Sequence, residues 1–394
     1  MLGEQSDISV ANFAGARLQL RIIILGIQLN FNQHKTGEYL MRKNKEKFTS
    51  VNTDQIAQEF MRDVSPNLIF AKEFFWFYQN GVWKQQEKRA IAGKIQSMIA
   101  AYNPSWVKSR LVEDIYRQVS RSLDMHFTGE FDSQKNLVCL ENCVLDTETL
   151  ETLPHDRNLF QTINFPFAYV PDAKAPLWLK FLDEIFPKNL YGDTERTKAR
   201  LQEWAGYCLI PTAKLEKCLY LHGEDQNGKG VFLKILASML GDNIVFVEPK
   251  NMFSRFQLIV IMGKLVNICS GIKSHTVMSP AFENVVSGGP CTCDIKYKNK
   301  ITFSPFAKHI FSSNQELPSE FLACKFFRGL DMLTFRRQFS EKDQDEMLVE
   351  KLQKEVAGIF NWALVGLQRL RGQNWGLTSS DDFKQIHKEN YNVV

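Results

Sequence analysis

The first regular pattern of hydrophobic and polar residues begins just after residue 50. In "SVNTDQIAQEFMRDV" the apolar residues Ile56, Phe60 and Val64 recur at helical spacing, and Asn52 precedes them as a helix cap. The next run, "EFFWFYQNGVWKQ", predicts two aromatic strands joined by a tight turn at "NG". Its aromatic side chains could stack on nucleic-acid bases, but aromatics in a hairpin more often bury against a helix.

A helical pattern then covers about residues 85–126, and its basic side chains are most simply explained as a solvated face. A second hairpin, "LVCLENCVLDTETLETL", is predicted with Asn142-Cys143 at its turn. The Pro-rich stretch "NFPFAYVPDAKAP" predicts a linker around 164–176. Helices follow it as far as Pro211.

The second half of the chain alternates short apolar runs with helical patterns, as α/β proteins do. "KCLYL" predicts a buried strand, "VFLKILASML" predicts a helix that stops at Gly241, and "GKLVNICSGI" and "KHIF" predict further strands. Near the carboxyl end, apolar residues step by four and three as in one long amphipathic helix. These residues are Leu348, Leu352, Val356, Ile359, Ala363, Leu367 and Leu370.

A glycine-rich loop lies between the predicted strand "KCLYL" and the predicted helix. Its spacing, Gly223-x-x-x-x-Gly228-Lys229, is that of a phosphate-binding loop, and a strand before it and a helix after it are the context this motif needs. Backbone N–H groups at the helix start would face the β-phosphate of ATP, and the Lys229 ammonium would reach the β and γ oxygens. The predicted cofactor-binding residues are Gly223, Glu224, Asp225, Gln226, Asn227, Gly228, Lys229, Gly230 and Val231.

The residues that usually hold Mg²⁺ beside such a loop are missing at two positions. Gly230 stands where these loops carry a hydroxyl, and the next suitable strand ends in Cys269-Ser270-Gly271 instead of an acid. An acid does follow the apolar run "NIVFV", namely Glu248, which is either a metal ligand or an ordinary strand-end carboxylate. Because the loop is of the phosphate-binding type, ATP with Mg²⁺ is the expected cofactor. The residues that would hold the metal stay unassigned.

Polar and basic residues downstream extend the candidate site. Asn314 follows the strand "KHIF", where a polar side chain can sense a γ-phosphate or orient water. The strands around "CDIKYKNKITF" enclose a basic tip with Lys296, Lys298 and Lys300.

Composition and charge exclude few classes of protein. A net charge of +4 over 394 residues is too small to identify a nucleic-acid binder by itself. The eight cysteines lack the paired spacing of a zinc site and are expected as reduced thiols in a cytoplasmic protein. The apolar run "LQLRIIILGIQLNF" is interrupted by Arg21 and Gln28 and is too short for a membrane span.

The order of these motifs, from about residue 53 to the end, resembles the superfamily 3 helicase of phage- and plasmid-encoded primase–helicases, which are kin to the poxvirus primase-helicase. The resemblance rests on "LENCVLDTETLETLPHD", "WLKFLDEIF", "HGEDQNGKG", "KLVNICSGI", "SGGPCTCDIKYKNKITFSPFAKHIFSSNQELP" and "EVAGIFNWALVGLQRL". It implies an α/β fold: an AAA+-like P-loop ATPase core preceded by a mostly helical amino-terminal domain with short β-hairpins.

The resemblance also implies roles for single residues. Lys229 corresponds to the motif A lysine, Asn314 to the sensor asparagine and Arg328 to the arginine supplied to a neighbouring subunit's γ-phosphate. Lys296 and Lys298 correspond to the tip of the DNA-gripping hairpin. The implied partners are single-stranded and forked DNA, further copies in a hexameric ring that moves 3′ to 5′, and a separate primase or replication initiator, with no membrane.

The sequence departs from that family at several motif positions. Besides Gly230 and Gly271, Pro290 stands where Asp is common and an arginine pair is reduced to Arg328-Gly329. No polymerase-like primase domain fits before residue 50, so we expect a helicase module without priming activity or a fragment of a longer protein. The expected domains are 1–50 (poorly defined), 51–163 (α+β), 164–204 (linker and helical collar), 205–340 (P-loop core) and 341–394 (helical).

Three functions fit these patterns. The first is a DNA-stimulated ATPase and helicase for replication of a phage, plasmid or genomic island. The second is a nucleotide- and DNA-binding ring or partner protein that hydrolyses ATP poorly or not at all. The third is an unrelated phosphate-loop enzyme such as a small-molecule kinase, against which the basic tip and Arg328 argue.

Overall fold

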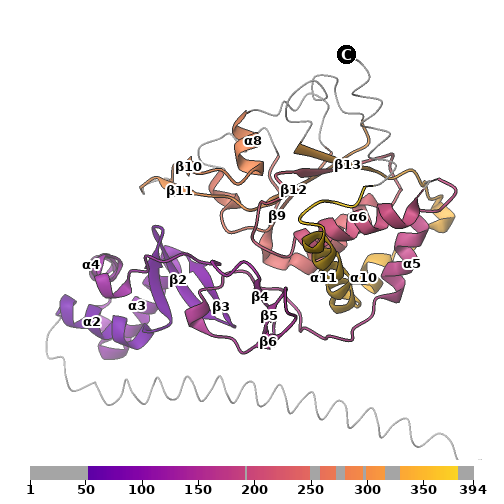
Figure 1. Cartoon of the computed structure of the whole chain (residues 1–394). Helices are drawn as coiled ribbons and strands as arrows, with labels where there is room; N and C mark the ends of the chain where they lie inside the picture. Colours follow the sequence, from indigo (N-terminus) through magenta and orange to yellow (C-terminus); the bar gives the residue numbers. More distant parts are fainter. Residues whose placement is uncertain are drawn as a thin grey trace, which may run out of the picture. The chain divides into compact units, whose positions relative to one another are not determined.

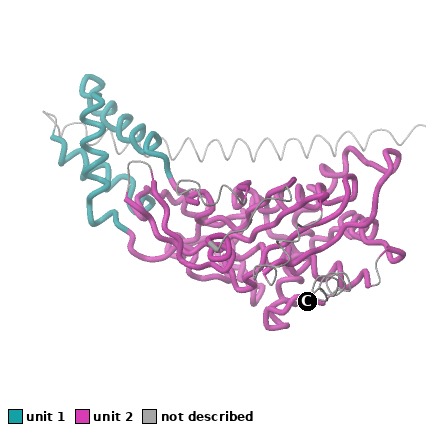
Figure 2. Tube along the Cα trace, turned by 90° about the horizontal axis from the view of Figure 1, so that it is seen from above, with its two compact units in different colours: residues 1–69, 86–126 teal, residues 70–85, 127–394 magenta. Residues whose placement is uncertain are grey.

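The computed structural model describes residues 52–190, 193–248, 258–271, 280–295, 299–315 and 329–379. It divides into two compact units, coloured separately in Figure 2, with described residues 52–69 and Gln86–His126 in the first and the rest of the described chain in the second. The expected amino-terminal segment 1–50, the basic-tip residues Lys296 and Lys298, and Arg328 lie outside the described residues.

The first unit is built on α-helices. Helix α2 (Thr53–Val64) begins where the sequence predicts, because the Asn52 side chain accepts hydrogen bonds from the backbone N–H groups of Asp54 and Gln55, each at 3.1 Å. The other two are α3 (Lys88–Tyr102) and α4 (Ser109–Arg121). Between these two helices the chain turns at Asn103-Pro104. Their basic side chains are largely exposed, and Glu113 pairs with Lys88 at 2.8 Å and Arg117 at 3.5 Å, as expected of a solvated face.

Two small antiparallel hairpins lie early in the chain. The first joins β2 (Phe74–Gln79) to β3 (Val82–Gln86), next to β1 (Leu68–Ala71), and both Asn80 and Gly81 have positive φ, as the predicted tight turn requires. Of its aromatic residues, Phe75 and Trp83 are buried.

The second hairpin turns one residue earlier than expected. Strands β4 (Leu137–Cys139) and β5 (Val144–Asp146) pair, β6 (Thr152–Leu153) follows, and Leu140 N–H donates to the Cys143 carbonyl at 2.8 Å. Glu141-Asn142 therefore occupies the turn, and the prediction of Asn142-Cys143 is wrong. The cause lies outside the hairpin, because the Asn142 amide exchanges hydrogen bonds with the backbone of Tyr169, at 2.8 and 3.0 Å.

A five-stranded parallel sheet forms the centre of the second unit (Figure 1). Its strand order is β13-β7-β12-β9-β8, and every neighbouring pair is parallel. The strands are β7 (Cys218–His222), β8 (Ile244–Val245), β9 (Val266–Ser270), β12 (Lys308–Ser313) and β13 (Leu330–Thr334). A separate antiparallel pair, β10 (Cys291–Cys293) and β11 (Ile301–Phe303), forms a hairpin. The mixed α/β class with a parallel sheet is thus as the sequence predicts.

Helices cover both faces of this sheet, as the alternation along β7 shows. Leu219 and Leu221 belong to the large core that α5, α6, α7 and α11 build, whereas Cys218 and Tyr220 pack with Phe282 of α8 on the other face. The helices are α5 (Pro176–Ile185), α6 (Thr194–Tyr207), α7 (Lys229–Leu240), α8 (Pro280–Val286), α10 (Leu348–Gln353) and α11 (Val356–Gly372). The stretch expected as a linker contributes to the large core, since Phe165, Phe167 and Tyr169 are buried in it.

The long helix expected near the carboxyl end is two helices. Helix α10 ends at Gln353 and α11 begins at Val356, so the prediction of one continuous helix is wrong. At the break, the Glu355 carboxylate accepts hydrogen bonds from the first backbone N–H groups of α5, at 3.1 Å from Leu177 and 2.9 Å from Trp178. None of the helices in the described ranges is long and apolar enough to cross a membrane.

Candidate nucleotide site

The glycine-rich loop follows the carboxyl end of a central strand. Strand β7 ends at His222, residues 223–228 form the loop, and α7 begins at Lys229. Gly223 has φ 140° and a side chain there would collide with the Phe335 carbonyl oxygen, 2.2 Å from an added Cβ. The strand, loop and helix therefore follow one another as the glycine spacing predicts, at the edge where parallel α/β sheets bind ligands.

The Lys229 ammonium lies within the loop itself. It donates to the carbonyl oxygens of Gly223 and Glu224, at 2.5 and 2.7 Å, and to the Asn227 side-chain oxygen at 3.0 Å. Burial lowers the pKa of Lys229, and the charges of Asp225 and Glu224 oppose that shift. A phosphate that binds here would accept hydrogen bonds from the Lys229 ammonium in place of some of these loop oxygens.

Asn227 fixes the shape of the loop. It is 2% exposed, its oxygen accepts from the Lys229 backbone N–H at 3.2 Å, and its amide donates to the Phe335 carbonyl at 3.2 Å. The sequence places Asn227 in the loop but gives no sign of this bracing role, because Phe335 is more than a hundred residues away.

The candidate sensor Asn314 lies at the neighbouring strand end. Strand β12 pairs directly with β7, and the Gly223 N–H donates to the carbonyl of Ser313 at 3.2 Å. Asn314 follows Ser313 and is exposed. The structure thus brings the loop and Asn314 to the same edge of the sheet.

Strand β9, at whose end the acid of a magnesium site is expected, ends without a carboxylate. Strand β9 pairs with β12 and ends at Ser270, and Gly271 N–H donates to the Ser312 carbonyl at 2.8 Å. Glu248 follows β8, the edge strand three positions from β7, which is about 14 Å at ordinary strand spacing. Within the described ranges, no group of three His, Cys, Asp or Glu residues is placed to hold a metal ion.

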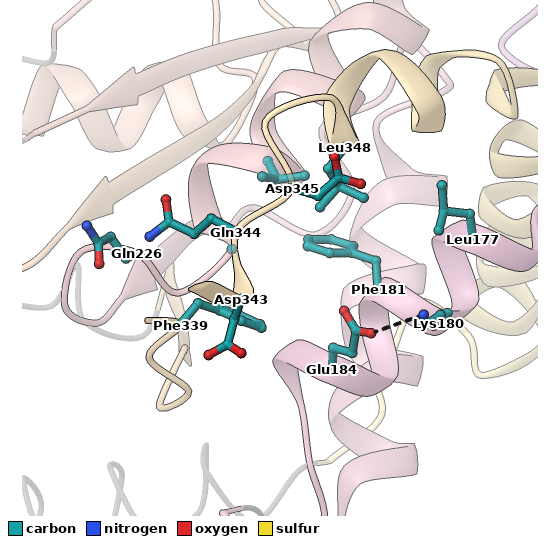
Figure 3. Close-up of a pocket in the computed structure, with 12 residues that line it drawn as sticks. Leu177, Lys180, Phe181, Glu184, Gln226, Phe339, Asp343, Gln344, Asp345 and Leu348 are labelled. Atoms are coloured by element: carbon teal, nitrogen blue, oxygen red, sulfur yellow. Dashed lines mark ion pairs between the residues drawn. The ribbon is translucent and has the colours of Figure 1, made fainter. Parts of the chain in front are cut away.

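A pocket of 360 Å³ opens beside the start of α7 (Figure 3). Apolar side chains from α5, α7 and the segment before α10 line it, among them Phe181, Val231 and Phe339. Gln226, Gly228 and Val231 belong both to this pocket and to the predicted cofactor-binding loop. The lining also includes the polar or charged residues Lys180, Glu184, Gln226, Asp343, Gln344 and Asp345.

The segment after β13 runs along the loop. Phe335 N–H donates to the His222 carbonyl at 2.7 Å, and Phe339 N–H donates to the Gln226 carbonyl at 2.9 Å. Between these two anchors lies Arg337, which the sequence patterns do not assign to the site. Only the fold could reveal it, because no phosphate-loop motif specifies an arginine there.

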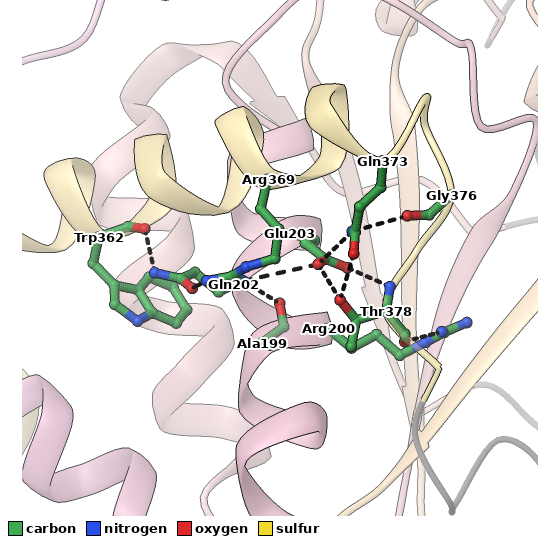
Figure 4. A network of polar contacts seen from close by, with 9 residues as sticks. All are labelled: Ala199, Arg200, Gln202, Glu203, Trp362, Arg369, Gln373, Gly376 and Thr378. Atoms are coloured by element: carbon green, nitrogen blue, oxygen red, sulfur yellow. Dashed lines mark hydrogen bonds and ion pairs between the residues drawn. The ribbon is translucent and has the colours of Figure 1, made fainter.

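Buried polar contacts hold the strand that leads into this segment. Asp331 of β13 pairs with the Arg200 guanidinium of α6, whose Nε lies 2.9 Å from Oδ1, and it also accepts from the Trp204 indole. On the same helix, Glu203 accepts from Gln373 at 3.0 Å and from the Thr378 N–H at 2.7 Å (Figure 4). Helix α6 therefore joins β13 to the chain that follows α11.

The basic tip is described only at its margin. Lys300 pairs with Asp294 at 3.5 Å, so part of its charge is compensated within the hairpin. Asn299 donates to Glu73 at 3.0 Å. The assignment of Lys296, Lys298 and Lys300 to DNA and of Arg328 to a neighbouring subunit stays a prediction.

Two family models match separate parts of the chain. Residues 54–187 match the family described as D5 N terminal like. Residues 221–324, which contain the loop and Asn314, match a family of unknown function, DUF5906. The first match supports the relation to primase–helicases that the motifs indicate, without singling out a superfamily 3 module. No curated protein matches the chain.

Solved structures share the fold at low sequence identity. The structure titled "The A form apo structure of NrS-1 C terminal region-CTR" has a TM-score of 0.53 and 12% identity, and the match covers 86% of this chain and 75% of that one. "The apo structure of NrS-1 C terminal region (305-718)" gives a TM-score of 0.53 at 11% identity, over 86% and 76%. The likeness therefore extends over most of both chains.

Proposed function

We propose that this chain is the ATP-binding, DNA-translocating module of a phage-type primase–helicase replication protein, with an AAA+-like P-loop core. The observation that carries the proposal is the shared sheet edge. The loop that leads to Lys229 follows β7, and Asn314 follows the adjacent strand β12. One group that binds phosphates and one that can sense the γ-phosphate or orient water thus lie on neighbouring strands.

The lining of the pocket beside α7 supports an orientation of the bound nucleotide, with the base in the pocket and the phosphates on the loop. Its apolar side chains suit a base, and residues of the loop and of α7 line part of it. Two of its acidic residues are compensated by lysines, since Glu184 pairs with Lys180 at 3.7 Å and Asp345 with Lys351 at 2.5 Å. The base and ribose would therefore occupy the pocket, and the phosphates would extend over the N–H groups at the start of α7.

Within the described part of the chain, the residues at the expected positions do not fit a magnesium ion held by the protein. Gly230 and Gly271 offer no side-chain oxygen, and Glu248 follows the far edge strand. This arrangement favours the second candidate function, a nucleotide- and DNA-binding replication partner that hydrolyses ATP slowly. The chemistry that the described side chains support is nucleotide binding by Lys229 and the loop N–H groups, with water orientation by Asn314.

The remaining features of the proposal follow from the family resemblance. They are a hexameric ring completed by Arg328 of a neighbouring copy, movement 3′ to 5′ on single-stranded or forked DNA, cooperation with a separate primase or initiator, and action in the cytoplasm of a bacterial host.

The decisive experiment combines nucleotide binding with hydrolysis. ATP binding is measured by calorimetry, and ATP turnover is titrated with single-stranded DNA. Binding with DNA-stimulated turnover and unwinding of a forked duplex supports the helicase. Binding of ATP and DNA with little turnover supports the second candidate, and no binding of either ligand contradicts both.

A further inference from the structure

Arg337 is held beside the phosphate loop by its own backbone neighbours. The two hydrogen bonds from Phe335 to His222 and from Phe339 to Gln226 fix the segment at both sides of it. Asn227 adds a third connection through the Phe335 carbonyl. The position of the Arg337 backbone relative to the loop is therefore determined by the fold.

Arg337 is a half-buried residue with one unsatisfied donor. Its Nε is buried and has no hydrogen-bond partner among the described residues, and its carbon Cζ lies 5.2 Å from the centre of the Phe339 ring. The carboxyl group of Asp343 has a lowered pKa, chiefly because of hydrogen bonds with Ser340 and in smaller part because of the Arg337 charge. A buried donor without an acceptor is costly, and a bound ligand is one of the ways in which such a group is satisfied.

Phe339 and Asp343 locate this guanidinium relative to the pocket. Both residues line the pocket beside α7, as does Gln226 of the loop (Figure 3). A nucleotide with its base in the pocket and its phosphates on the loop would place its sugar and its first phosphates beside Phe339. Arginine suits such a position because its planar donors match phosphate oxygens in pairs.

Lys229 alone does not neutralise the negative charge of a nucleotide's phosphates. Its ammonium already contacts three oxygens within the loop, and Glu224 and Asp225 add negative charge nearby. Arg337 would supply a second cation from the same chain.

We propose that Arg337 binds the phosphates of the nucleotide in cis and completes the anion site that the loop and Lys229 begin. This inference rests on the proposed nucleotide site and adds a residue that neither the glycine-loop motif nor the family resemblance assigns.

Arg336 provides the matched control. It is the adjacent arginine in the sequence, it is exposed, and its guanidinium donates to the Leu190 carbonyl at 2.9 Å. Replacing either arginine with alanine changes the net charge equally, so a difference between the two variants reports position and not total charge.

The test measures binding of ATP, ADP, AMP and adenosine to the full chain by calorimetry, with weak ligands measured by competition. Arg337→Ala should weaken ATP and ADP about ten- to a hundredfold, as expected for loss of charged hydrogen bonds. Adenosine affinity should be unchanged, Arg337→Lys should restore part of the loss, and Arg336→Ala should match the wild type. If Arg337→Ala does not fold, Arg337→Met, which keeps most of the apolar stem, takes its place.

The outcomes separate this inference from the proposed function. A wild-type chain that binds no nucleotide contradicts both. A wild-type chain that binds ATP, together with an Arg337 variant of equal ATP affinity, overturns only the role of Arg337. Equal losses for adenosine and ATP would make Arg337 a structural residue of the pocket, which also overturns the inference.

Discussion

The Glu355 carboxylate accepts a hydrogen bond from the backbone N–H of Trp178 at 2.9 Å, across 177 residues of sequence. Its other oxygen accepts from Leu177 at 3.1 Å, so one side chain satisfies two unpaired donors at the start of α5. A negative charge at that end also interacts favourably with the helix dipole. Helix α5 lines the candidate base pocket, and Glu355 thereby connects the carboxyl-terminal helices to the site.

Replacing Glu355 with alanine should lower the free energy of unfolding by about 2 kcal/mol, because it leaves two donors at the helix start without their acceptor. Chemical denaturation measures the loss. Glu350→Ala, an exposed carboxylate on α10, is the control and should change stability by less than about 0.5 kcal/mol. Equal effects of the two substitutions would contradict the capping role.

This capping contact shows why sequence patterns located some elements and not others. The Asn52 cap and the Asn80-Gly81 turn act within a few residues, so local spacing predicts them. The apolar spacing around Glu355 continues without interruption, and the helix break depends on α5, far away in the sequence. The turn at Glu141-Asn142 was missed for the same reason, since Tyr169 selects it.

Lys308 predicts a specific dependence of stability on pH. Its side chain is buried at the start of β12, where it donates to the Ile210 carbonyl and lies 4.8 Å from the centre of the Tyr207 ring. Burial lowers its pKa to about 7; the neighbouring Cys208 thiol opposes this shift and the charge of Lys135 adds to it. Between about pH 7 and 10.5 the unfolded chain therefore binds a proton that the folded chain does not.

The contribution of Lys308 to the free energy of unfolding should consequently rise with pH through that window. From pH 7.0 to 8.5 this contribution is at most about 2 kcal/mol. The buried cysteines act in the opposite direction in every variant, because burial raises the pKa of their thiols while the thiols of the unfolded chain ionise from about pH 8. Urea unfolding at both pH values isolates Lys308 by comparison: the change in the free energy of unfolding from pH 7.0 to 8.5 should be less favourable in Lys308→Met than in the wild type. Lys354→Met, at an exposed position of the α10–α11 junction, should show the wild-type change. An unchanged pH dependence in Lys308→Met would show that this lysine is protonated in the fold.

Lys229→Ala should remove most of the affinity for ATP and ADP, because it deletes the cation inside the loop. Calorimetry measures the effect. Lys234→Ala, an exposed lysine of the same helix, should bind as the wild type does. Unchanged affinity in Lys229→Ala would show that the 223–230 loop does not bind the phosphates.

The basic tip should contribute to DNA binding independently of sequence. Replacing Lys296 and Lys298 with alanine should weaken single-stranded DNA binding for all sequences alike and reduce the salt slope by up to about two phosphates' worth. Lys300→Ala should have a smaller effect, because Asp294 already compensates part of its charge. Fluorescence anisotropy at several salt concentrations measures both. Wild-type affinity and slope in the double variant would make the tip a solvated turn.

The candidate site was only partly predictable from sequence. The glycine spacing and its flanking strand and helix indicate the loop, because these features are contiguous. Asn227 and Arg337 acquire their positions from the segment after β13, which reaches the loop only in the folded chain. A sequence motif that ends at Gly230 carries no information about that segment.

The last prediction concerns the two missing magnesium ligands. An added Cβ at Gly230 meets nothing within 4 Å, so a serine fits there without displacing a neighbour. Gly271 also has open space, but its φ of 71° makes a side chain costly by about 1–2 kcal/mol. We therefore expect slow hydrolysis in the unmodified chain. Gly230→Ser combined with Gly271→Glu should raise the rate at least about tenfold at some loss of stability.

Gly230→Ala with Gly271→Gln is the matched control, because it has nearly the same bulk and the same backbone strain without the hydroxyl or the charge. ATP turnover at several Mg²⁺ concentrations should rise only in the Ser/Glu variant, and that variant should need less Mg²⁺ for half-maximal rate. Rapid DNA-stimulated turnover by the wild-type chain would contradict the prediction. Glu248, or a metal ion held through water, would then have to replace the missing ligands.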